Sequence, residues 1–182
     1  ACAMEWLSTA FPAGPAAARN VGIEASRTDV LAFTDDDCEP ESDWLLRLLE
    51  RLLVASNDVA GCGGRVVAVG DDRLSGFYTY HKILEPPEGL AYLVTANAAF
   101  RKDWVMDVGG FDDRIRNPGG EDTELSFRIG LLGGTFVYEP RAVVRHNYRT
   151  RVADFARTFY GYGCGGRYCA DLLFPLGAEE VR

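Results

Sequence analysis

The order of apolar and polar positions along the chain predicts a mixed α/β protein. Residues 30–34 form a short apolar run that ends at three aspartates, which is the pattern of a strand buried on both faces. Leucines and a tryptophan recur at helical spacing in residues 44–53 and predict a helix with one apolar face. Residues 59–69 and 93–102 have the composition of further strands, the first interrupted by glycines.

Further helices and strands are predicted on either side of these elements. A proline followed by three alanines begins a predicted helix over residues 15–26. Another helix begins at Glu121 and ends at the glycine pair 133–134. Two short strands follow it, over residues 135–139 and 142–147.

The remaining segments have weaker patterns. Residues 5–10 are strand-like, and residues 70–89 predict a long loop that contains a short helix. Residues 152–173 alternate aromatic and charged positions and predict a helical tail, in spite of glycines near its middle. The elements together predict an α/β fold in which helices flank a mostly parallel sheet, with one domain over residues 1–150 and the tail over residues 151–182.

The composition narrows the classes of function. With 182 residues and a formal net charge of -8, the chain can bury one core but lacks the basic surface that nonspecific nucleic-acid binding requires. A phosphate ligand would therefore need a cation to accompany it. No apolar run is long enough to span a membrane, and the first residues do not resemble a signal peptide. We therefore expect a soluble, cytoplasmic chain.

The cysteines indicate neither a disulfide framework nor a zinc site. Their number is odd, no CxxC motif is present, and only two histidines accompany them. Reduced thiols are expected at Cys2, Cys38, Cys62, Cys164 and Cys169.

Asp35, Asp36 and Asp37 form the densest carboxylate cluster in the sequence, directly after the predicted strand over residues 30–34. The carboxyl ends of strands are where open α/β sheets bind ligands. Adjacent carboxylates repel one another unless a cation lies among them, and oxygen ligands favour Mg²⁺ or Mn²⁺ over zinc. The alternative is a solvated acidic loop that caps the following helix.

Two other positions could carry chemistry. Glu121 and Asp122 begin a predicted helix after the flexible pair Gly119 and Gly120, which leaves their carboxylates exposed. The alternative is that they only cap the helix, because the helix dipole favours acidic residues there. His146 follows a predicted strand, and a single histidine is more often a structural group than a ligand.

Four segments stand in a fixed order and spacing: GPAAARNVGIEAS, LAFTDDDCEPESDWL, TANAAFRKDWVMDVGGFDD and GGEDTELSFRIGLLGGTFVYEPRAVVRHNY. Together they resemble the family 2 glycosyltransferases of the GT-A fold, over residues 14–148. The resemblance implies a GT-A-like, Rossmann-related fold. It also implies transfer of a sugar from a nucleoside diphosphate sugar to an acceptor hydroxyl with inversion, with Mn²⁺ or Mg²⁺ as cofactor.

The resemblance assigns five residues to the donor and its cation. Asp35 and Asp37 match the outer acids of the DxD motif, and Asp37 is the stronger candidate for direct metal coordination. Asp36 would turn toward the sugar or ribose, and Arg19 resembles an arginine near the nucleotide. His146 matches a histidine that completes the metal shell in some members of the family.

Four more residues are assigned to catalysis and to the donor sugar. Asp122 matches the general base of the family, and Glu121 is the neighbour most easily confused with it. Asn97 and Ala98 would line the floor beneath the donor sugar.

The sequence departs from the family at its start and leaves alternatives open. Family members begin with a strand, a helix and a second strand, so we expect roughly 60 to 80 residues of the domain to be missing, with half the nucleotide pocket. A nucleotidyltransferase and an inactive truncated domain that acts as a binding module are the rival functions. The acceptor could be a polysaccharide, a lipid-linked sugar, a protein or a small molecule, and the tail could contact the acceptor, a partner or a membrane surface.

Overall fold

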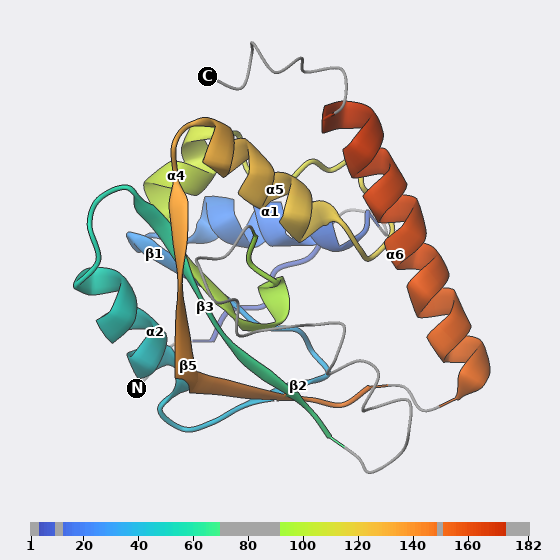
Figure 1. Ribbon diagram of the computed structural model, residues 1–182, viewed down its shortest axis with the longest axis horizontal. Helices are drawn as coiled ribbons and strands as arrows, with labels where there is room; N and C mark the ends of the chain where they lie inside the picture. Colours follow the sequence, from blue (N-terminus) through green and yellow to red (C-terminus); the bar gives the residue numbers. More distant parts are fainter. Residues whose placement is uncertain (1–3, 10–12, 70–91, 149–150, 174–182) are drawn as a thin grey trace.

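The computed structural model describes residues 4–9, 13–69, 92–148 and 151–173, and a five-stranded sheet lies at its centre (Figure 1). The strands follow the order β1-β4-β3-β5-β2 across the sheet. Their bounds are β1 Val30–Phe33, β2 Cys38–Pro40, β3 Val59–Ala68, β4 Ala98–Arg101 and β5 Thr135–His146.

The directions of the strands correct one expectation. Strands β3 and β5 pair in parallel, whereas β1 with β4, β3 with β4 and β2 with β5 pair antiparallel. The sheet of the described residues is therefore mostly antiparallel. The apolar run over residues 30–34 predicts a strand but not the direction of its neighbours, and β1 is not buried on both faces, since Ala32 is exposed.

Helices cover both faces of the sheet. They are α1 Pro15–Ala25, α2 Trp44–Leu53, α4 Lys102–Asp107, α5 Glu121–Leu131 and α6 Val152–Leu173, with a 3-10 turn η1 at Thr95–Asn97. Helices α1, α4 and α5 pack around Phe100 on one face. Helix α2 packs Leu48 and Leu52 onto the other. Helix α6 stands beside the sheet rather than on it (Figure 1).

The structure confirms the predicted helices over residues 15–26 and 44–53, the helix that begins at Glu121, and the helical tail. None of the helices in the described ranges is both long and apolar enough to cross a membrane. The loop predicted over residues 70–89 lies outside the described residues.

Several predicted strands differ from the observed ones. The two short strands over residues 135–139 and 142–147 are one continuous strand, β5. It tolerates Pro140 because the register with β3 shifts there, between Gly64 and Arg65 on the partner strand. Residues 5–9 form no strand, and the strand predicted over 93–102 begins only at Ala98, after η1.

Candidate functional site

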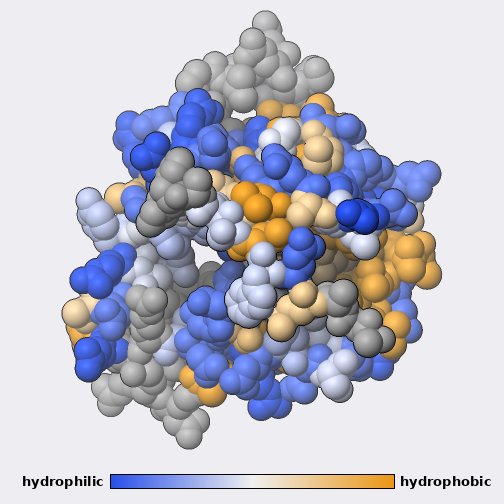
Figure 2. Space-filling view, turned by 180° about the vertical axis from the view of Figure 1, so that it is seen from behind, coloured by the Kyte–Doolittle hydropathy of each residue, from blue (hydrophilic) through white to orange (hydrophobic). Residues whose placement is uncertain are grey.

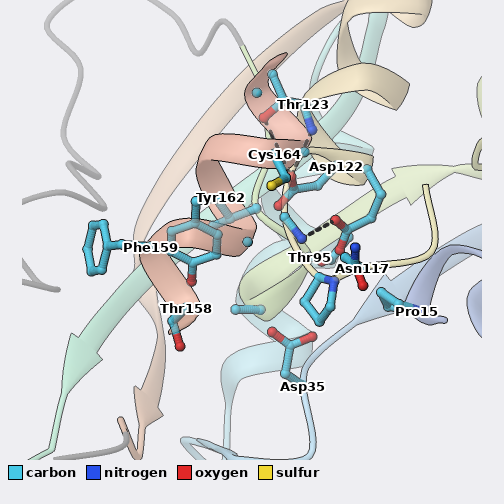
Figure 3. Close-up of a pocket in the computed structure, with 18 of the residues that line it drawn as sticks. Pro15, Asp35, Thr95, Asn117, Asp122, Thr123, Thr158, Phe159, Tyr162 and Cys164 are labelled. Carbon is cyan, nitrogen blue, oxygen red and sulfur yellow. Dashed lines mark hydrogen bonds between the residues drawn. The ribbon is translucent and has the colours of Figure 1, made fainter. Parts of the chain in front are cut away.

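A cleft of about 1030 Å³ lies between α6, the start of α5 and the loop that joins β1 to β2. Figure 2 shows the hollow from behind, between α6 and the body of the domain. Seven of the nine residues that the sequence singles out line this cleft: Arg19, Asp35, Asp36, Asp37, Glu121, Asp122 and His146. Figure 3 shows Asp35 and Asp122 entering it from opposite sides, with Thr158 and Tyr162 of α6 on a third.

Four potential metal ligands gather where the acidic loop meets the end of β5, and all but Cys38 line the cleft. Asp35, Asp37, Cys38 and His146 each offer a ligand atom, and these atoms all lie within 4.8 Å of one another. His146 Nε2 lies 3.4 Å from Asp37 Oδ1, and its ring stacks on that of Tyr148. Two carboxylates and an imidazole form a donor set that fits Mn²⁺ or Mg²⁺.

Backbone hydrogen bonds bring these ligands together from distant parts of the chain. The amide of Cys38 donates to the carbonyl oxygen of Asp35 at 3.1 Å and closes a tight turn around the aspartates. The amide of Asn147 donates to the carbonyl oxygen of Asp37 at 2.8 Å, which fastens this turn to the end of β5. The acidic loop is therefore held against the strand that carries His146.

Arg19 connects the acidic loop to the start of α5. Its Nη2 donates to Asp35 Oδ1 at 3.0 Å and its Nη1 to Glu121 Oε1 at 2.7 Å. Burial lowers the pKa of Arg19, but hydrogen bonds and charges from Glu121 and Asp35 outweigh it and raise the pKa overall. The predicted nucleotide arginine thus forms an ion-pair bridge between two sets of acids.

The two acids at the start of α5 differ in their surroundings. Glu121 is buried, and both of its carboxylate oxygens are engaged, Oε1 by Arg19 and Oε2 by the amide of Gly119 at 2.8 Å. Asp122 is half-buried and lines the cleft, where its Oδ1 accepts the amide of Thr123 at 2.8 Å. Of the two acids, Asp122 is therefore the more exposed within the cleft.

The structure corrects the expected floor of the site. Asn97 and Ala98 are fully buried and do not line the cleft. The Asn97 amide group donates to the carbonyl oxygens of Arg65 and Ala142, each at 2.8 Å, and accepts from Trp44 Nε1 at 2.7 Å. The 3-10 turn directs Asn97 into the core, and the preceding residues of the chain, 94–96, form the wall instead.

Helix α6 approaches the loop before α5 very closely, a feature that sequence reasoning missed. A Cβ atom on Gly165 would overlap the carbonyl oxygen of Gly119. One turn further along, Cys169 Sγ donates to the carbonyl oxygen of Gly120 at 3.2 Å. Gly119 and Gly120 themselves adopt φ values of 115° and 97°, which favour glycine. The sequence signal for this contact was the pair Gly161 and Gly165, which lie four residues apart and so share one face of α6.

This contact leads to a prediction for Gly165→Ala. The added methyl group must push α6 from the Gly119 carbonyl, so we expect a loss of about 1 to 3 kcal/mol in the free energy of unfolding. Gly166→Ala is the matched control, because a Cβ there meets nothing within 4 Å and alanine favours a helix by up to about 1 kcal/mol. Denaturant unfolding measures both, and equal midpoints for the two variants would contradict the proposed contact.

The aromatic residues of the tail lie where α6 borders the cleft. Phe159 and Tyr162 line it, with their ring centroids 5.5 Å apart, and Phe155 contacts Phe159 at 4.5 Å. The aromatic residues of the tail therefore contribute to the wall of the cleft.

Comparison with known proteins gives the family. The family described as Glycosyl transferase family 2 matches residues 8–109, more than half of the chain. The chain therefore belongs to glycosyltransferase family 2, as its sequence motifs predicted.

Two relatives illustrate how much of a longer protein the chain covers. It is 34% identical to pre-mycofactocin glycosyltransferase of Mycobacterium tuberculosis, over 88% of this chain and 36% of that protein. It is 28% identical to polypeptide N-acetylgalactosaminyltransferase 10 of Homo sapiens, over 74% of this chain and 26% of that protein. The chain thus spans about a third or less of the length of these relatives.

Two solved structures share the fold. The structure of GalNAc-T7 with UDP, GalNAc and Mn²⁺ matches with a TM-score of 0.58 at 17% identity. The match covers 81% of this chain and 34% of the GalNAc-T7 chain. The structure of mannosyltransferase PcManGT from Pyrobaculum calidifontis, in complex with GDP-Man and Mn²⁺, matches with a TM-score of 0.58 at 19% identity. The match covers 85% of this chain and 44% of the PcManGT chain. The predicted α/β fold of the GT-A type, with helices flanking its sheet, is confirmed.

Proposed function

We propose that this chain forms the donor-binding and catalytic part of a metal-dependent, inverting glycosyltransferase. The observation that carries the proposal is that two separate groups of acidic residues line one cleft. Asp35 and Asp37 lie beside His146 in the group of potential metal ligands, whereas Asp122 lies at the start of α5. A transfer between a diphosphate and a hydroxyl needs both functions.

The donor is a nucleoside diphosphate sugar. In support, the two solved neighbours hold Mn²⁺, with UDP in one and GDP-Man in the other. In this chain Asp35, Asp37 and His146 would hold the cation, which when bound neutralises negative charge that develops on the leaving diphosphate. The chain carries a formal net charge of -8, so a diphosphate needs such a cation to approach these acids.

The residues of this chain then divide the remaining work. Asp122 takes the proton of the acceptor hydroxyl as that oxygen attacks the anomeric carbon. Arg19 and Glu121 hold the acidic loop and the start of α5 in place through their ion pair. Tyr162 and Phe159 of α6 form an aromatic wall, which we assign to the acceptor side in preference to a membrane surface because both face the cleft.

The experiment that tests this function is nucleotide binding by the variant Asp37→Ala. Calorimetry with UDP and with GDP, each with and without Mn²⁺, should show that the variant has lost the metal-dependent gain in affinity. Asp107→Ala removes an exposed acid that lies outside the cleft, and it should bind as the wild type does. Unchanged nucleotide affinity of Asp37→Ala in the presence of Mn²⁺ would show that the cation binds elsewhere.

The rival functions predict other products. A nucleotidyltransferase attacks phosphorus and releases pyrophosphate, whereas a glycosyltransferase releases a nucleoside diphosphate. A binding module releases neither from a nucleotide sugar. Family membership favours the glycosyltransferase.

A further inference from the structure

We propose that Cys38 supplies a fourth, sulfur ligand to the cation site, so that the site also takes thiophilic cations such as Zn²⁺ and Co²⁺. The inference rests on the proposed function, because it concerns the same cluster of acids. It adds a residue that the motifs of the sequence did not single out for metal binding.

The register of the sheet places Cys38 beside His146. The two residues are direct partners in the antiparallel pair of β2 and β5. Side chains of direct partners project from the same face of a sheet, with Cβ atoms about 4.5 to 5.5 Å apart. The thiol and the imidazole therefore face one another, although they are far apart in the sequence.

The four ligand atoms are already close to the spacing of a metal site. The Sγ atom of Cys38 lies 3.9 Å from Asp37 Oδ1, and all four atoms lie within 4.8 Å of one another. Zinc binds sulfur at about 2.3 Å and nitrogen or oxygen at about 2.0 to 2.2 Å, so tetrahedral ligands lie roughly 3.5 Å apart.

The chemistry of the donor set separates two classes of cation. Mn²⁺ and Mg²⁺ prefer carboxylate oxygens and gain little from sulfur, whereas thiolate and imidazole select Zn²⁺ and Co²⁺. One cysteine, one histidine and two aspartates can provide all four ligands of a tetrahedral zinc ion. Four protein ligands close the coordination of zinc and leave no position for a diphosphate, so zinc at this site competes with the donor.

The other described cysteines do not share this position. Burial raises the pKa of the Cys62 thiol to about 12 and that of Cys169 to about 11, so both stay protonated near neutral pH. Cys164 is exposed on α6 and lines the cleft, but it is not one of the four residues whose ligand atoms cluster. Cys164 is therefore a matched control for the replacement of a cysteine.

The test is a titration of the chain with Co²⁺, followed by the sulfur-to-cobalt charge-transfer absorption in the near ultraviolet. Wild type and Cys164→Ser should show this band, and Cys38→Ser and Cys38→Ala should not. Competition with Zn²⁺ should show an affinity at least about 10-fold lower in both Cys38 variants, since even residues outside the first coordination shell change metal affinity by 10- to 100-fold. Mn²⁺ affinity should change by less than about twofold, because sulfur contributes little to it.

The outcomes separate this inference from the proposed function. A charge-transfer band that persists in both Cys38 variants, or zinc affinity equal to that of the wild type, overturns the role of Cys38. If Mn²⁺-dependent nucleotide binding is still lost in Asp37→Ala, the proposed function stands alone. Thermal unfolding without metal checks that the variants fold. If they unfold at the same temperature as the wild type, loss of the charge-transfer band means that a metal ligand has been removed.

Discussion

Replacement of Asp122 by asparagine should lower sugar transfer by about 10²- to 10⁴-fold, the range expected for loss of a positioned general base. The amide keeps the shape of the side chain and can still accept the amide of Thr123 through its oxygen. Binding of Mn²⁺ and nucleotide should therefore stay at the level of the wild type. Single-turnover rates with a nucleotide sugar, together with calorimetry, measure the two effects separately.

The neighbouring acid provides the control for this assignment. Glu121→Gln keeps an oxygen for the Gly119 amide but removes the charge that pairs with Arg19. We expect this variant to lose stability, with a smaller loss of turnover than Asp122→Asn. An Asp122→Asn protein with near-normal turnover, beside a stable but inactive Glu121→Gln protein, would move the base to Glu121.

The second large effect is expected for Arg19→Met. The variant leaves the buried carboxylate of Glu121 without its cation, and breaking a buried ion pair in this way costs about 3 to 5 kcal/mol. Denaturant unfolding should show a loss of this size. The side chain of Arg19 is only 17% exposed and that of Glu121 only 6%, so solvent screens the pair little.

The double variant Arg19→Met with Glu121→Gln tests the cause of that loss. Neutral glutamine removes the uncompensated charge and keeps a group for the Gly119 amide, so the double variant should recover most of the lost stability. The alternative result is that Glu121→Gln lowers the free energy of unfolding by the same amount in the Arg19→Met protein as in the wild type. The two residues would then act independently, and the ion pair would not contribute to stability.

Elements with strong periodicity could be predicted from the sequence, and elements defined by pairing could not. The leucines of α2 and the apolar run of β1 mark where these elements lie along the chain, and both elements are found there. Strand β2 was missed because three residues carry no period. The predicted directions of the strands were wrong because a short apolar run does not show whether the neighbouring strands are parallel or antiparallel to it.

The positions of candidate site residues could be predicted where they depend on the end of a strand or the start of a helix. Asp35 and Asp37 follow a strand and Asp122 lies in the first turn of a helix, as their positions in the sequence predicted, and all three line one cleft. Asn97 was misplaced because a single turn of 3-10 helix decides whether its amide faces the cleft or the core. The nearness of Cys38 to His146 depends on the register between distant strands, which motifs do not encode.

The short strand β2 has a consequence for how the domain would respond to a cation. It is three residues long, lies at the edge of the sheet, and within the described residues pairs with β5. Short edge strands open locally at little free energy, so their amide protons exchange readily with solvent. A cation held by Asp37 and His146 would bind both strands, and at 100 times its dissociation constant it adds about 2.7 kcal/mol against that opening. Hydrogen exchange at residues 38–40 would then slow with metal occupancy, while the centre of β3 stays protected throughout.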